Sequence, residues 1–230
     1  MDFYVQRKKI KNMNLRVLED GKVLVSIPDY VPMSKAEEFV KAKSSWIEKQ
    51  RNKIIKIKDL KETKEFKPGE QVYFLGKKYK LKVIPAKLNQ VILGEDNLEI
   101  YIKEKFVNNN EYIKKCYEKW LKECCYNFCQ KFVLIYQNKM QKYNIPLPEI
   151  QIKNLKSRWG ACIPAKKSVV FSMNLVKTPI ECLEYVVVHE LAHFKYLNHS
   201  KKFYSFVSLY IPDWAEKRKI LNDEYSRIII

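Results

Sequence analysis

The sequence lacks the marks of several large protein classes. No stretch approaches the roughly 18 apolar residues that cross a bilayer, and the start, MDFYVQRKKI, has no apolar core of a secretory signal. A Cys-x-x-Cys pair and a Walker loop are also absent. These absences argue against a membrane protein, a cysteine-based zinc finger and a P-loop nucleotidase. They predict a cytoplasmic protein whose six cysteines are reduced thiols.

Acidic residues and arginine are both scarce. Against 44 basic residues stand 26 acidic ones, a net charge of +18, and only six of the basic residues are arginine. Proteins that read phosphates and base edges favour the bidentate fork of arginine. The lysine excess therefore fits the composition of an AT-rich genome as well as an attraction to polyanions. Binding of nucleic acid through a basic surface stays open on this evidence.

The first half of the chain is rich in strand and turn signals. Period-two alternation flanks Asp20-Gly21, and similar patterns turn at Gly76-Lys77 and at 94–97, so three hairpins are predicted. Between the first two, Ser34 and Glu37 have the spacing of a capping box and precede a one-sided apolar stripe. The stripe predicts a single amphipathic helix.

The second half is more helical. A long helix is predicted over residues 110–143, with two apolar faces and a left-handed end at Asn144. Strands are expected at 149–154 and 168–175. Core packing is the expected role of the cysteines, which are Cys116, Cys124, Cys125, Cys129, Cys162 and Cys182. The fold class is therefore α+β, divided into a β-rich basic module at 1–106 and a second domain at 107–230.

All three histidines lie within eleven consecutive positions, in the stretch VVVHELAHFKYLNHSKKF. A helix is predicted to begin just before this stretch, because Thr178-Pro179 resembles an N-cap followed by proline at the first helical position. His189 and His193 are four residues apart, so both imidazoles face one side of that helix and can bind one ion. Glu190 lies about 100° away around the axis, where it can act as a general base toward a water on the metal.

A third ligand is expected because catalytic zinc usually takes three protein ligands. His199 is the remaining histidine, and it can reach the ion only if the helix ends and the chain turns after about Tyr196. Ser200 then has the position of an N-cap for a new helix. The alternative for His199 is a histidine on a surface loop.

The residues around this motif are similar to a known family. HELAHFKYLNHSKKF resembles the YgjP-like metallopeptidases, and more distantly the SprT and WLM zinc proteases. KSRWGAC at 156–162, SMNLVKTP at 172–179 and IPDW at 211–214 occur in the family's order, and the basic N-terminal hairpin also matches. Ala161 stands where the family usually has serine. The resemblance implies a zincin-like (minigluzincin) core, Zn²⁺ bound by the three histidines, and Glu190 as catalytic base.

Further residues have candidate roles beside structural alternatives. Arg158 could orient a substrate carbonyl or form a structural ion pair, and Tyr196 or Tyr204 could stabilise an oxyanion. Asp213 could orient a ligand histidine, although an N-cap role for the last helix is the simpler expectation. The strand at 168–175 could be an edge strand that binds extended peptide, or a purely structural one.

The preferred reading is a zinc-dependent hydrolase acting on peptides or proteins, with Glu190 activating the attacking water. One alternative is a metal-dependent hydrolase of phosphoesters or nucleotides. Another is a protease that a basic front brings to protein on DNA, as in SprT relatives. The physiological substrate and the oligomeric state are not predicted by any pattern in the sequence.

Overall fold

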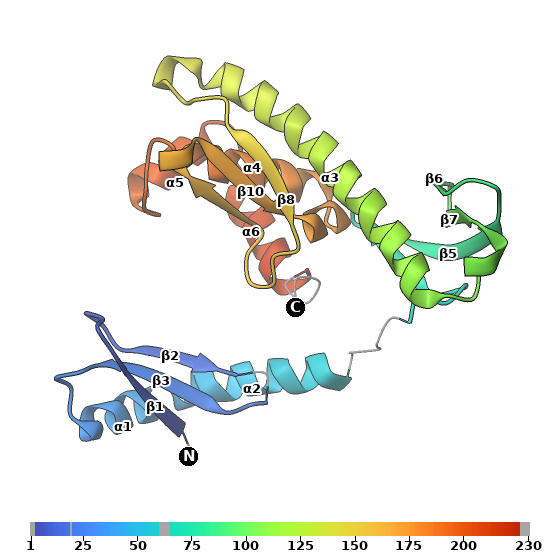
Figure 1. Cartoon of the computed structure of the whole chain (residues 1–230). Helices are drawn as coiled ribbons and strands as arrows, with labels where there is room; N and C mark the ends of the chain where they lie inside the picture. The colour runs from blue at the N-terminus through green and yellow to red at the C-terminus, as the bar shows by residue number, and fades with distance from the viewer. Residues whose placement is uncertain (1–2, 19, 60–64, 226–230) are drawn as a thin grey trace. The chain divides into compact units, whose positions relative to one another are not determined.

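The computed structural model describes residues 3–18, 20–59 and 65–225, with side chains up to residue 51 in the second range. The chain forms two compact units, Met1–Lys64 and Glu65–Ile230. In this part of the chain no helix combines the length and apolar character needed to cross a membrane. Each unit is described by itself (Figure 1).

The first unit is a three-stranded sheet with two helices. β2 and β3 form the hairpin expected at Asp20-Gly21, with Val17 opposite Val23. β1 lies on the other side of β3 and runs parallel to it, so β3 is the central strand and its side chains are mostly buried. The elements are β1 (Phe3–Lys8), β2 (Asn14–Val17), β3 (Val23–Pro28), α1 (Met33–Ala42) and α2 (Ser44–Asp59).

The helical part of this unit differs from the expectation. Two helices replace the single one, because the helix ends at Lys43 and a new one begins at Ser44. The capping box is also wrong: the N-cap is Pro32, without a side-chain hydrogen bond, and Ser34 already lies inside α1. Proline has a φ angle suited to entering a helix, so the first turn forms here without a polar cap.

The second unit begins with a four-stranded sheet of order β4-β5-β7-β6. Both expected hairpins are confirmed, and β5 pairs with β7 in parallel. At the turn between β4 and β5, the main-chain N–H groups of Leu75 and Gly76 donate to the carbonyl oxygens of Val176 and Lys177. These two residues come just before the helix that carries His189. The sheet therefore supports the entry to that helix. The strands are β4 (Gln71–Phe74), β5 (Lys77–Pro85), β6 (Gln90–Leu93) and β7 (Asn97–Ile102).

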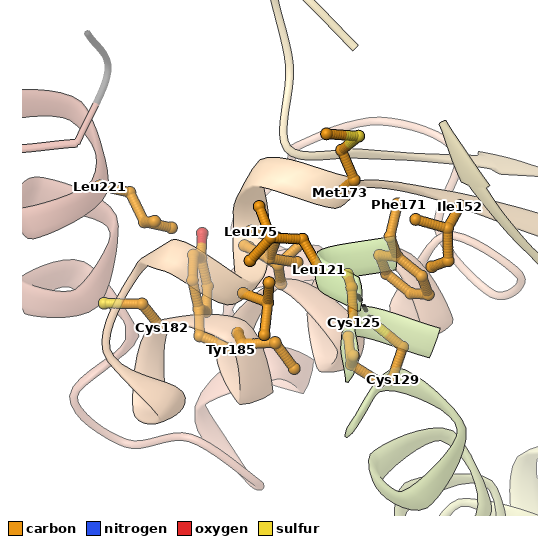
Figure 2. Close-up of a cluster of buried hydrophobic side chains, with 14 of the residues drawn as sticks. Leu121, Cys125, Cys129, Ile152, Phe171, Met173, Leu175, Cys182, Tyr185 and Leu221 are labelled. Atoms are coloured by element: carbon orange, nitrogen blue, oxygen red, sulfur yellow. Dashed lines mark hydrogen bonds between the residues drawn. The ribbon is translucent and has the colours of Figure 1, made fainter. Parts of the chain in front are cut away.

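α3 (Asn110–Lys139) is the long helix expected from the sequence, and it packs on more than one side. Figure 2 shows Leu121, Cys125 and Cys129 of this helix beside Phe171. All six cysteines are free thiols; Cys125, Cys129 and Cys182 are buried and the other three are half-buried. The helix ends four residues earlier than expected, and Asn144 takes the left-handed conformation after a 3-10 turn.

A second sheet of three strands has the order β8-β10-β9. β10 is therefore its central strand, parallel to β8 and antiparallel to β9, and the expectation of an edge strand at 168–175 is wrong. The edge nearest the histidines belongs to β9, which the sequence patterns did not indicate. The strands are β8 (Glu149–Lys153), β9 (Gly160–Ile163) and β10 (Ser168–Ser172).

Three helices complete the unit, and the fold is a mixed α+β arrangement. One hydrophobic core contains Ile100 and Ile102 of the four-stranded sheet together with Ile113 of α3. The position 106/107 lies inside the second compact unit, and a division into domains there stays a prediction. The helices are α4 (Ile180–Ala192), α5 (Lys201–Ser208) and α6 (Trp214–Asp223), with 3-10 turns at Glu104–Phe106, Gln141–Tyr143, Pro164–Lys166 and Met173–Lys177.

Candidate metal centre

α4 carries the motif that the sequence singled out. It begins after Pro179, which holds the N-cap position without a side-chain hydrogen bond. The expected threonine cap is wrong, because the Thr178 hydroxyl donates to the Leu175 carbonyl oxygen at 2.8 Å. The regular helix ends at Ala192, with His193 as its C-cap in right-handed conformation. Turn hydrogen bonds continue to Tyr196, whose N–H donates to the Ala192 carbonyl oxygen, so the chain changes direction about where the sequence predicted.

The three histidines converge. One nitrogen of each imidazole lies within 4.8 Å of those of the other two, and the Nε2 atoms of His189 and His199 are 2.9 Å apart. His199 comes from the loop before α5, whose N-cap Ser200 accepts a hydrogen bond from the Phe203 N–H, as expected. The loop therefore brings His199 to the other two.

Phe203 is a supporting residue that the sequence patterns did not identify. Its ring is fully buried and its centroid lies 4.7–5.0 Å from the centroids of all three imidazoles. An apolar ring in contact with three imidazoles limits their rotation and excludes water on that side. The N-cap position of Ser200 predicted a helix here, but not that Phe203 lies against the histidines.

Hydrogen bonds on the far side of the imidazoles orient two of them. His193 Nδ1 donates to the Tyr196 carbonyl oxygen at 2.9 Å, since a carbonyl can only accept. His189 Nδ1 lies 3.3 Å from the Tyr185 hydroxyl. With Nδ1 engaged in this way, Nε2 of each ring is left to face the cluster, which is the usual arrangement for a metal-binding histidine.

The surroundings keep the imidazoles of His189 and His199 neutral. Burial, followed by the charges of His193 and His199, lowers the pKa of His189 to about 3. Burial also lowers the pKa of His199. A neutral imidazole has a free lone pair, so these rings can bind a metal at neutral pH without first losing a proton.

The donor set fits a zinc ion. In a tetrahedral site with Zn–N bonds near 2.0–2.1 Å, ligand nitrogens lie about 3.3 Å apart. The observed separations, from 2.9 Å up to 4.8 Å, bracket that value, so small rotations of the rings suffice. Three nitrogen donors beside a pocket would also leave a coordination position free for water or substrate.

Glu190 is buried next to this cluster, with 5% of its surface exposed. Burial raises the pKa of its carboxyl to about 8, although the Cys162 N–H and the charge of Arg158 act in the opposite direction. Gly160 lies against the same carboxyl group: a Cβ atom built there would be 2.7 Å from Glu190 Oε1. β9 therefore holds the carboxyl group between its main-chain atoms and α4.

A pocket of about 800 Å³ opens over these residues. Its lining includes the three histidines and Glu190, residues 157–162, which lead into and form most of β9, and a face of α6. The Trp159 carbonyl oxygen accepts a hydrogen bond from the Ser172 N–H, so the main-chain groups of Trp159 face β10. Because hydrogen-bonded and non-hydrogen-bonded residues alternate along an antiparallel pair, the main-chain groups of Gly160 and Cys162 point away from β10. In the described sheet, that outer edge of β9 has no strand partner.

Some of the other residues that the sequence suggested for the site line this pocket, and others do not. Arg158 and Tyr204 line the pocket. Tyr196 is not part of that lining, and its ring packs against Phe206. Asp213 forms an ion pair with Lys217 and makes no side-chain cap to α6, although it holds the N-cap position. Cys162 lines the pocket as well as packing against the core.

Comparison with known proteins extends over nearly the whole chain. The family model that matches describes a metallopeptidase domain and covers residues 11–224. The match places the chain in the class of metal-dependent peptidases, to which a group of three converging histidines is suited. The chain belongs to the YgjP-like family. No curated protein matches it.

Proposed function

We propose that this chain is a zinc metallopeptidase with a zincin-like core, in which His189, His193 and His199 bind the metal and Glu190 is the general base. The observation that supports it best is the convergence of three imidazoles beside a buried carboxyl group in one pocket. A cytoplasmic location and the basic surface as a nucleic-acid site stay predictions.

When bound, zinc would polarise the scissile carbonyl group and increase the acidity of a water molecule. The protein's own contribution is to position the base. Glu190 accepts a proton from the attacking water as its oxygen bonds to the carbonyl carbon. The same carboxyl group then delivers that proton to the amine nitrogen as the C–N bond breaks, so the group returns to its ionised form.

The raised pKa of Glu190 suits this role, because a carboxylate in a water-poor site is a stronger base than an exposed one. A cation held by the neighbouring imidazoles favours the ionised form. The Cys162 N–H also favours that form, since it donates a hydrogen bond to the carboxylate.

The free edge of β9 offers a place for an extended substrate. Main-chain groups of Gly160 and the carbonyl group of Cys162 point toward the outer side of the sheet, whereas the Cys162 N–H is bonded to Glu190. A peptide added at this edge would pair with the remaining groups and lie along the pocket. Addition of a strand recognises the peptide main chain, so this edge supports action on unfolded or extended protein. It takes the place of the role first expected for 168–175.

The experiment is cleavage of an unfolded protein by the full chain with and without a metal chelator. Glu190→Gln is expected to lower the rate by at least about a thousandfold, because the base is lost while the shape is kept. Glu181→Gln on the exposed first turn of α4 is the matched control and keeps full activity.

Nucleoside triphosphates and protein bound to DNA are assayed beside the unfolded protein. Phosphate release that depends on Glu190, without peptide cleavage, would replace this proposal with a phosphoester hydrolase. Cleavage that requires DNA would indicate a DNA-associated protease instead. Cleavage that continues unchanged in Glu190→Gln would refute the assignment of the base.

A further inference from the structure

Two of the chain's six arginines, Arg158 and Arg218, line the metal pocket. Two other arginines bond to main-chain carbonyl groups instead: Arg7 donates to the carbonyl oxygens of Asp29 and Val31, and Arg51 donates to that of Gly21. In a protein that uses lysine almost everywhere, arginine at a pocket suggests a site that needs its planar fork.

The charged residues that line the pocket are mostly basic. Glu190 is the single acidic residue in its lining, and its carboxyl group is buried against β9. Among the described side chains, no carboxylate lies within 4.0 Å of Arg158 or Arg218. Both arginines thus line the pocket without an ion-pair partner among the described side chains, although the charge of Arg158 still acts on Glu190.

Arg218 is the better held of the two. Its Nη1 donates to the Tyr204 hydroxyl at 2.9 Å, and its guanidinium carbon lies 5.7 Å from the centre of the Tyr204 ring. That ring is stacked on Trp214, with centroids 4.1 Å apart and planes at 17°. It also lies near the rings of Phe203, at 5.2 Å, and His199, at 6.0 Å. Tyr204 therefore has little freedom, and it fixes the arginine near the proposed metal ligands.

Within the described residues, most of the hydrogen-bonding capacity of Arg218 is unused. A guanidinium group has five N–H donors, and the bond to Tyr204 uses one of them. Arg218, Leu221 and Asn222 line the pocket at helical spacings of three and four residues, so one face of α6 forms this wall. This wall presents the guanidinium N–H donors of Arg218, the side-chain amide of Asn222 and the apolar side chain of Leu221.

We propose that Arg218, held by Tyr204, forms a subsite for a carboxylate of the peptide substrate. The inference rests on the proposed peptidase function and names its substrate class: peptides with an acidic group near the scissile bond. A carboxylate can accept two parallel hydrogen bonds from a guanidinium group, which makes the contact directional as well as charged. Either an acidic side chain or a C-terminal carboxylate can supply this group.

Binding is measured first, because it does not depend on turnover. The zinc-loaded full chain carrying Glu190→Gln is mixed with pools of short peptides that bear an uncharged dye, and fluorescence anisotropy is followed at physiological salt. One pool has a single glutamate at each position in turn with an amidated end. A second has glutamine instead, and a third has glutamine with a free C-terminal carboxylate.

Arg218→Gln is expected to weaken binding of a carboxylate-bearing pool about tenfold and to leave the amidated glutamine pool unchanged. The glutamate pool and the free-end pool report which carboxylate the subsite takes. Arg218→Lys keeps the charge without the fork and recovers part of the loss. Lys219→Gln is the matched control: it removes the same charge from the neighbouring exposed position and leaves binding of every pool unchanged.

Equal losses in Arg218→Gln and Lys219→Gln would overturn the subsite, since they would reduce it to attraction by the net charge of +18. So would a carboxylate preference that survives Arg218→Gln. Mass spectrometry of peptides cleaved by the active chain provides the second readout. There, cleavage next to acidic residues is expected to fall in Arg218→Gln while cleavage elsewhere persists. If the active chain cleaves nothing, the peptidase proposal fails, and the binding measurement still decides whether the subsite exists.

Discussion

Gly160 of β9 lies directly against the carboxyl group of Glu190 on α4. A Cβ atom at position 160 would be 2.7 Å from Glu190 Oε1 and 2.8 Å from Cγ, closer than atoms can approach without movement. The backbone of Gly160 has no left-handed φ, and the three heavy atoms nearest to a built Cβ all belong to Glu190, so the neighbouring glutamate is what excludes a side chain here.

Gly160→Ala is therefore expected to displace Glu190, lower the rate of peptide cleavage by at least about tenfold, and destabilise the fold by about 1–3 kcal/mol. Urea unfolding measures the second effect. In a Glu190→Ala background the cost should nearly vanish, because the group that clashes is gone. An equal cost in both backgrounds would show that some other contact forbids a side chain at position 160.

The Tyr185 hydroxyl is the partner of His189 on the side away from the cluster. Tyr185→Phe removes it and should weaken zinc affinity about tenfold or more, as loss of such partners does in other metal sites. Competition with a fluorescent chelator measures this. Tyr136→Phe is the control, since Tyr136 is also buried but bonds to Glu184 on the opposite side of the helix. Similar losses in both variants would contradict a specific role for Tyr185.

Ser200 connects helix capping with metal binding, because it follows His199 and caps α5. Ser200→Ala is expected to cost about 1 kcal/mol of stability and to weaken zinc binding as the loop loosens. Ser200→Asp preserves an acceptor for the Phe203 N–H and should keep both properties. Calorimetry and zinc titration report the two effects, and an unchanged zinc affinity in Ser200→Ala would separate the cap from the site.

The half-buried thiols should react slowly. Burial raises the pKa of Cys124 to about 11 and that of Cys162 to about 12, so little thiolate is present at neutral pH. Since the thiolate is the nucleophile, the rate of iodoacetamide labelling should rise about tenfold for each unit of pH between 8 and 10. Peptide mapping with time measures it. A rate that levels off below pH 9 would mean that these thiols have ordinary acidity.

Local signals in the sequence were sufficient for much of the fold. The three hairpins, the long helix and the Ser200 cap depend on neighbouring residues, and the structure contains all of them. The spacing of His189 and His193 likewise predicted that they share a helix face. Where a local motif competed with proline, as at Pro32 and Pro179, the polar cap predicted beside it did not form.

Long-range pairing was beyond the reach of these patterns. β9 is four residues long and contains Gly160 and Cys162, so it has neither the length nor the alternation of a typical strand. Without β9, the sequence could not decide whether the strand at 168–175 was an edge strand or a structural one, and it is the central strand. The contacts of Phe203 with the imidazoles and of Gly160 with Glu190 join segments whose proximity only the folded chain determines.

The most direct test is elemental analysis of the full chain purified without added metal and then loaded with zinc. About one zinc ion per chain is expected in the natural protein and in Glu190→Gln, because both keep the three imidazoles. His189→Ala, His193→Ala and His199→Ala should each lose most of it while remaining folded. Full zinc content in all three histidine variants, or no zinc in the natural protein, would contradict the account.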